Sequence, residues 1–124
     1  MPTIFHIAFA DQWEAAKAAG SYRWSTRGQS LDDGAAFIHC SYAEQVAMVA
    51  NSFYGDVSGS LRLLVIDVEL LVSALCDEDL DAVGISFPHL YGPLNLDAVV
   101  DVRVYERGED GRWPEVAASV ATAE

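Results

Sequence analysis

The chain has 124 residues, the length of one typical domain, so we expect a single domain over residues 1–124. Nineteen acidic residues against seven basic ones give a formal charge of −12, which excludes non-specific binding to nucleic acids or anionic membranes because both require clustered Lys and Arg. No apolar run approaches the roughly 20 residues that cross a bilayer and no basic signal-peptide region opens the sequence, so the expected location is the cytoplasm.

The first elements follow from apolar runs and helix boundaries. Residues 3–8 (TIFHIA) are predicted to form a strand, and an alanine-rich helix follows up to Gly20. Asp11 is placed to cap this helix because Glu14 follows at the spacing of a capping box, and Gly20 is a typical helix end. The next predicted elements are a strand fragment or loop over 22–28, a turn over 31–34 and a second strand over 36–40.

A second helix and a central strand follow. Ser41 and Glu44 match a capping box, and the helix after them has one apolar face formed by Val46, Val49, Ala50 and Phe53. Residues 61–67 (LRLLVID) are almost continuously apolar, which predicts a central strand.

The second half is expected to contain few helices. The predicted elements are a short helix or turn over 68–75, an irregular stretch over 76–86, a turn-rich connector over 87–93, a strand over 98–105 and a hairpin turn over 108–111. The tail is expected to fray from about residue 115. Helices in the first half and strands in the second favour an α+β fold. Cys40 and Cys76 lack zinc-site spacing and are expected to be buried thiols.

The three histidines are the first candidates for a functional site. His6, His39 and His89 each lie in a short apolar or aromatic segment. A buried imidazole nitrogen without a partner costs about 1–3 kcal/mol, so three such positions suggest a shared polar pocket. The alternative is that each ring is structural and bonds a nearby carbonyl. The separations of 33 and 50 residues carry no metal signature, so no metal site is expected.

Strand alternation permits the rings of His6 and His39 to meet. His6 shares a strand face with Ile4 and Ala8, and His39 shares one with Phe37. Both rings project into one cleft if the opposite faces pack into the main core. Those opposite faces consist of Phe5, Ile7, Ile38 and Cys40.

A basic and aromatic patch precedes the second strand. Arg27 could pair with a pyrophosphate while Trp24 or Tyr22 stacks on a base. The alternative is a surface loop in which the arginines balance neighbouring acids. Tyr91 could pack beside His89 and close the cleft.

Four motifs in order resemble the bacterial domain-of-unknown-function 952 family. They are IFHIA, FIHCS followed by Gln45, LLVID and FPHLYGPLNLDAVVDV, and they span roughly residues 4–104. The resemblance implies a fold similar to the ADP-ribosyltransferase group, a split β-sheet that holds NAD in a central cleft. It also implies that His6 and His39 occupy the first two motif positions of that group.

The third motif position of that group carries a glutamate in many members, and FPHLYGPL offers none. Glu78 and Glu106 are the nearest acids, and neither is assigned this role. The resemblance implies binding of NAD or a related nucleotide. Together with the residues described above, the candidates for cofactor binding are His6, His39, Tyr91, Arg27 and Trp24, and the catalytic candidates for transfer of an ADP-ribosyl or phosphate-linked group are His6, His39 and His89. The acceptor would be a small molecule or a protein. The alternative is a non-catalytic ligand-binding or interaction module on the same fold.

Overall fold

The computed structural model describes residues 3–80 and 84–116 and shows an α+β fold. Both α-helices lie in the first half, as predicted: α1 (Ala10–Ala19) and α2 (Ala43–Phe53). The strands are β1 (Thr3–Ala8), β2 (Ser21–Tyr22), β3 (Ile38–His39), β4 (Leu61–Asp67), β5 (Ala74–Glu78), β6 (Phe87–Tyr91), β7 (Leu94–Asn95) and β8 (Val99–Tyr105). Short 3₁₀ turns cover Thr26–Gly28, Leu31–Asp33, Val68–Leu70 and Leu96–Ala98.

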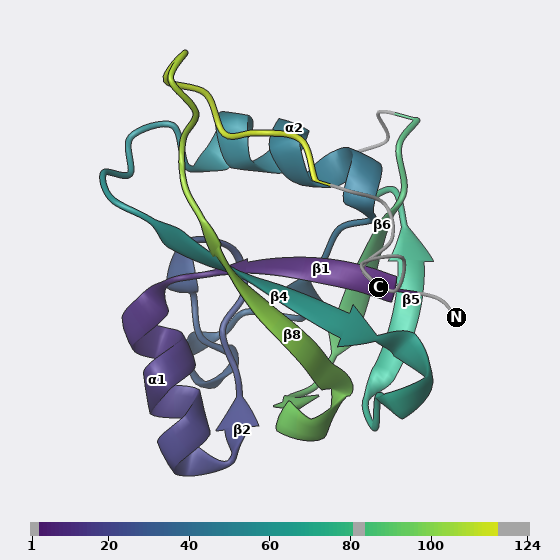
Figure 1. Cartoon of the computed structure of the whole chain (residues 1–124). Helices are drawn as coiled ribbons and strands as arrows, with labels where there is room; N and C mark the ends of the chain where they lie inside the picture. Colours follow the sequence, from purple (N-terminus) through teal and green to yellow (C-terminus); the bar gives the residue numbers. More distant parts are fainter. Residues whose placement is uncertain (1–2, 81–83, 117–124) are drawn as a thin grey trace.

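The strands form two antiparallel three-stranded sheets and one small pair. The orders are β1-β4-β8 and β3-β6-β5, with β2 paired to β7. The predicted central strand is confirmed, because β4 lies between β1 and β8. The two larger sheets meet where Phe5 of β1 and Ser41, just after β3, exchange backbone hydrogen bonds of 2.7 and 2.8 Å. In Figure 1, α2 lies across one side of the β1-β4-β8 sheet and α1 with β2 lies on the other.

The β1-β4-β8 sheet separates two hydrophobic cores. One core lies on the α2 side and contains Phe5, Ile7, Val46 and Trp113, while the other contains Ile4, Ala8, Ile38 and Cys40. The condition that Phe5, Ile7, Ile38 and Cys40 all face one main core is therefore not met. The reason is that β1 is buried on both faces, so Phe5 and Ile7 pack into one core while Ile4 and Ala8 pack into the other.

The helix boundaries differ from the prediction by about one residue. Phe9 is the N-cap of α1 and Asp11 lies inside the first turn, where its charge suits the helix dipole. Tyr42, not Ser41, precedes α2, and its N–H donates to the side chain of Gln45 at 3.0 Å, so Glu44 takes no part. Gly20 ends α1 with φ of 87°, as expected.

Two strands occupy stretches that the sequence suggested were irregular. β5 lies within the stretch assigned to a turn and an irregular segment, and β6 replaces the expected turn-rich connector. Pro88 is accommodated in β6 because its carbonyl accepts the N–H of Cys40, while its missing N–H falls opposite the point where β3 ends.

Three further predictions concern the two cysteines, the turn over 108–111 and the C-terminal tail. Cys40 is buried but Cys76 is exposed, and both are free thiols. A turn closes at 108–111, where the N–H of Gly111 donates to Gly108. The tail from residue 117 lies outside the described residues. No helix within 3–80 and 84–116 has the length and apolar character that a membrane crossing requires.

Candidate functional site

A pocket of about 350 Å³ lies over the outer face of the β3-β6-β5 sheet. Alternate residues of β6 point to this face, and His39 of β3 lies directly opposite His89 in the strand register. The inner face of the same sheet, with Ile38 and Leu90, packs into the core. The pocket walls combine imidazoles, aromatic rings, small polar groups and acids, chiefly Ser25, Phe37, His39, Glu78, Phe87 and His89.

His39 presents an unsatisfied ring nitrogen in this region. Its backbone is fixed on both sides, because its N–H donates to the Ser25 hydroxyl and its carbonyl accepts from His6. Its Nε2 is buried without a hydrogen-bond partner among the described residues. Burial, followed by the neighbouring His89 and His6, lowers the pKa of His39 to about 4. The ring is therefore neutral at pH 7, and one of its buried polar atoms lacks a hydrogen bond.

His6 lies beneath His39 and is enclosed. Its Nδ1 donates to the carbonyl of His39 at 2.7 Å, so its Nε2 accepts the hydroxyl of Tyr22 at 2.8 Å. Burial lowers the pKa of His6 to about 4, even though the bond to the His39 carbonyl acts in the opposite direction. His6 is 2% exposed and touches only a small void of about 10 Å³, not the pocket.

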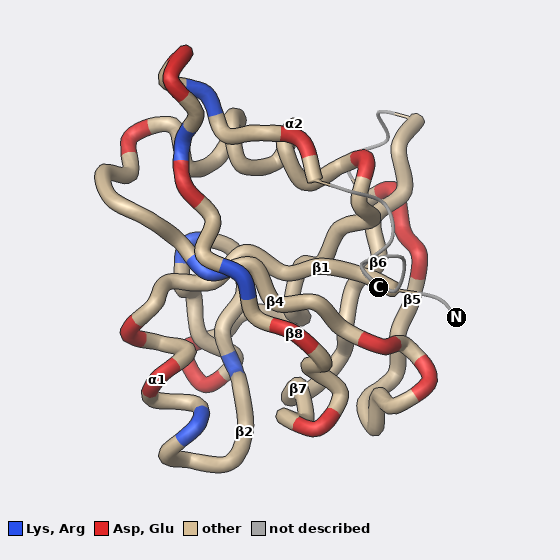
Figure 2. The backbone as a smooth tube through the Cα atoms, viewed as in Figure 1, with Lys and Arg blue, Asp and Glu red and all other residues tan. Residues whose placement is uncertain are grey.

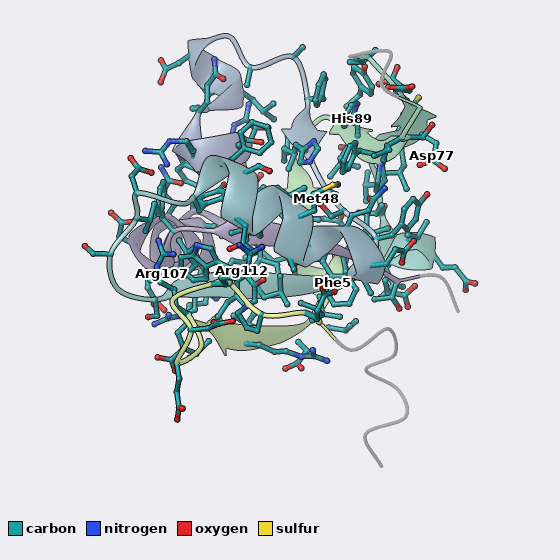
Figure 3. All side chains as sticks on the ribbon, turned by 90° about the horizontal axis from the view of Figure 1, so that it is seen from above. Phe5, Met48, Asp77, His89, Arg107 and Arg112 are labelled. Atoms are coloured by element: carbon teal, nitrogen blue, oxygen red, sulfur yellow. The ribbon has the colours of Figure 1, made fainter. Side chains whose placement is uncertain are left out.

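His89 belongs to a hydrogen-bonded cluster on the pocket wall. Its Nδ1 donates to Glu78 Oε1 at 2.9 Å, and the hydroxyl of Tyr91 donates to the same oxygen at 2.6 Å. The bonds from Tyr91 and His89 lower the pKa of Glu78, and the bond to Glu78 raises the pKa of Tyr91 to about 12. The ring of His89 stacks on Phe37 with centroids 3.9 Å apart. In Figure 3, His89 lies on the opposite side of α2 from Arg107 and Arg112.

The structure thus brings two of the three histidines together. The rings of His39 and His89 have centroids 5.3 Å apart and share the pocket. His6 reaches them only through the backbone of His39. Tyr91 lies beside His89 through their common partner Glu78, as expected, but it does not line the pocket that it was expected to close.

The basic and aromatic patch lies outside the pocket wall. Arg27 pairs with Asp56 at 2.8 Å and also donates to the carbonyl of Phe53, a residue that lines the pocket. Its guanidinium therefore lies beside a residue of the pocket wall without lining the pocket itself. Trp24 packs edge-on against Tyr22 beside the core, away from the pocket.

Glu78 is the site residue that the sequence did not single out. The sequence offered Glu78 and Glu106 as the acids nearest to the missing third-position glutamate and assigned neither. Only the pairing of β5 with β6 places Glu78 next to His89. Phe53 was also missed, because it was counted with the apolar core face of α2 but is 52% exposed and lines the pocket. The β5 sequence, ALCDE, has no alternating pattern, so periodicity did not indicate this strand.

The charge around the site is acidic. Among the described residues no Lys or Arg lines the pocket, whereas Glu78 and Asp79 do. Figure 2 shows the same contrast on a larger scale, since β5 carries acidic residues and neither β5 nor β6 carries a basic one. Within the described part of the chain, no group of three or more His, Cys, Asp or Glu side chains is arranged to hold a metal ion.

Comparisons with known proteins place this geometry in a family. The profile of the family described as "Protein of unknown function (DUF952)" matches residues 7–102. The crystal structure of protein CC0527 from Caulobacter crescentus is similar, with a TM-score of 0.74, 32% identity, and coverage of 91% of this chain and 94% of that one. The solution NMR structure of CC0527 gives a TM-score of 0.70 at 32% identity, with 90% and 91% covered. No curated protein matches the chain.

Proposed function

Because this chain belongs to the DUF952 family, we propose that it binds NAD or a related nucleotide, with the nicotinamide and its ribose in the pocket of His39 and His89. The observation that carries the proposal is the unpaired, buried Nε2 of His39 beside that pocket. A buried polar atom without a partner costs free energy, and a ligand that bonds to it recovers that cost.

The proposed fold, an ADP-ribosyltransferase-like split sheet, is consistent with the strand arrangement. Two three-stranded sheets adjoin along β1 and β3, and the first two motif histidines lie on these two strands. His39 would contact the nicotinamide. His6 would act from below, because both of its ring nitrogens are already bonded.

The shape and charge of the pocket favour the nicotinamide end of the nucleotide. A volume of about 350 Å³ is near the lower limit of ligand pockets, so the remainder of a dinucleotide would extend over the rim. Phe37 and Phe87 offer ring faces, and the acids Glu78 and Asp79 suit the positive pyridinium of NAD. The same acids would repel a phosphate.

The pyrophosphate would lie at the rim, near Arg27. The pair of Arg27 with Asp56 is exposed, and exposed pairs contribute only about 0–1 kcal/mol. Exchange of Asp56 for a phosphate therefore costs little. Trp24 lies away from the pocket, so stacking of a base on it would require the adenine end to reach across the loop that carries Arg27.

Calorimetric titration with NAD, ADP-ribose and nicotinamide tests the proposal. We expect NAD and nicotinamide to bind the wild type and to lose binding in His39→Ala. Arg27→Ala should weaken NAD and ADP-ribose but leave nicotinamide unchanged. Arg23→Ala is the matched control, because Arg23 also forms one exposed pair, with Asp32. Failure of all three ligands to bind the folded wild type would overturn the proposal.

The second candidate is a non-catalytic module that binds a ligand without phosphate. The absence of Lys and Arg from the pocket wall favours it. Following NAD by proton NMR in the presence of the protein separates the two candidates. Binding of NAD, either intact or with release of nicotinamide, supports the first candidate, while binding of nicotinamide without binding of NAD supports the module.

A further inference from the structure

Glu78 accepts two hydrogen bonds on one oxygen. His89 Nδ1 and the hydroxyl of Tyr91 both reach Oε1, at 2.9 and 2.6 Å. A carboxylate can only accept, so the Nδ1 of His89 must carry a proton. The neutral ring is then the Nδ1–H tautomer, and its Nε2 holds a lone pair.

The orientation of His89 is fixed from two further directions. Its ring stacks on Phe37 at 3.9 Å with planes 16° apart, and its backbone pairs with β3 and β5. The side chain is only 5% exposed. No described residue bonds to its Nε2, and that atom is not among the enclosed atoms that lack a partner, so it remains accessible.

We propose that Glu78 is a positioning residue that fixes His89 as the Nδ1–H tautomer, so that Nε2 accepts a hydrogen bond from the ligand. The pocket then selects ligands that offer a donor, such as a carboxamide N–H, over ligands that offer a carboxylate. The selectivity rests on the proposed nicotinamide pocket, while the tautomer is a property of the free protein.

The acidic charge of the pocket and the geometry of His89 both favour a carboxamide over a carboxylate. A carboxylate would meet the lone pair of His89, the charge of Glu78 and the acid Asp79, with no Lys or Arg on the wall to compensate. A carboxamide would donate to His89 and leave its own oxygen for another group. The two ligands nearest in shape that differ in this respect are nicotinamide and nicotinic acid.

The tautomer is tested by nitrogen-15 NMR of the histidine rings in the free protein at neutral pH. Wild-type His89 should show a protonated Nδ1 and an unprotonated Nε2. His6 is an internal reference, since its Nδ1 also donates, to the carbonyl of His39. In Glu78→Ala the His89 signals should move toward the Nε2–H form, which a solvated histidine side chain favours, while the matched control Glu106→Ala leaves them unchanged. An Nε2–H ring in the wild type, or an unchanged ring in Glu78→Ala, would overturn the inference.

The selectivity is tested by titration with nicotinamide and nicotinic acid. The wild type should bind nicotinamide at least about tenfold more tightly, a difference of about 1.4 kcal/mol. In Glu78→Ala this preference should fall to less than threefold, with Glu106→Ala again as the control. Equal binding of both ligands by the wild type would overturn the selectivity and leave the proposed function intact. Failure of both nicotinamide and NAD to bind would overturn the proposed function, and the NMR result would still decide the role of Glu78.

Discussion

The enclosed site of His6 and the open pocket of His39 and His89 use the same residue type in different ways. His6 has both ring nitrogens bonded, to the carbonyl of His39 and the hydroxyl of Tyr22. His39 has a buried nitrogen with no described partner, and His89 has one bonded nitrogen and one accessible nitrogen. Their sequence surroundings did not distinguish these roles, because all three histidines lie in short apolar or aromatic segments.

The difference separates a structural histidine from a histidine available for a ligand. A satisfied ring stabilises the core around it, while an unsatisfied ring destabilises the free protein and is retained for another reason. Removing His6 should therefore cost stability, and removing His39 should cost ligand binding. The expected loss of stability is therefore largest for His6→Ala and smallest for His39→Leu.

The largest effect is expected for His6→Ala. The substitution removes a buried ring, leaves a cavity between the two sheets and strips the Tyr22 hydroxyl of its partner. We expect a loss of about 3–5 kcal/mol in the free energy of unfolding, by analogy with other large-to-small core changes. Urea denaturation at pH 7 measures it. A loss below about 1 kcal/mol would mean that His6 is not structural.

Acid should destabilise the protein through the two shifted histidines. The pKa of both His6 and His39 is lowered from 6.5 to about 4 by burial. The unfolded chain therefore binds more protons than the native state, so stability is complete above about pH 6.5 and is lost as the pH falls toward 4. From pH 6.5 to 4.5 each ring contributes a loss of roughly 2 kcal/mol. Urea denaturation across this range checks it, and His6→Gln should flatten the dependence.

A smaller effect is expected for Tyr22→Phe. The substitution keeps the buried ring but leaves the Nε2 of His6 unpaired, which costs about 1–3 kcal/mol. Tyr105→Phe is the control, because its hydroxyl donates to the carbonyl of Pro114 and not to an imidazole. Thermal unfolding of both variants makes the comparison. Equal losses of stability in the two variants would show that the bond between His6 and Tyr22 contributes no more than the bond between Tyr105 and Pro114.

Much of the fold could be predicted from periodicity. The strand over 3–8, the central strand over 61–67 and the strand after Val99 were found because their apolar patterns are long and undisturbed. β6 was missed because it contains Pro88, which lacks the N–H that a paired strand residue donates. The proline fits here because β3 ends beside it, and the sequence alone does not show where β3 ends. β5 was missed because it is a short edge strand rich in acids, and charges commonly protect such edges.

The site could be predicted only in part for the same reason. The histidines were identifiable from their rarity and their apolar neighbours. The separation of His6 from the pocket depends on the partners of its ring, and the role of Glu78 depends on the register of β5 against β6. Neither of these can be obtained without the pairing of strands that are distant in sequence.

The smallest effect on stability is expected for His39→Leu. The same substitution should abolish ligand binding, so the two effects differ most in this variant. The substitution removes the buried nitrogen that has no described partner and keeps an apolar side chain of similar size against Phe87. Replacing an unsatisfied polar group in this way is nearly neutral, so the free energy of unfolding should stay within about 1 kcal/mol of the wild type. Stabilisation by NAD, about 2.7 kcal/mol at a hundred times the dissociation constant in the wild type, should disappear. A large loss of stability in His39→Leu would place His39 with His6 among the structural rings, and retained stabilisation by NAD would show that the ligand does not depend on this nitrogen.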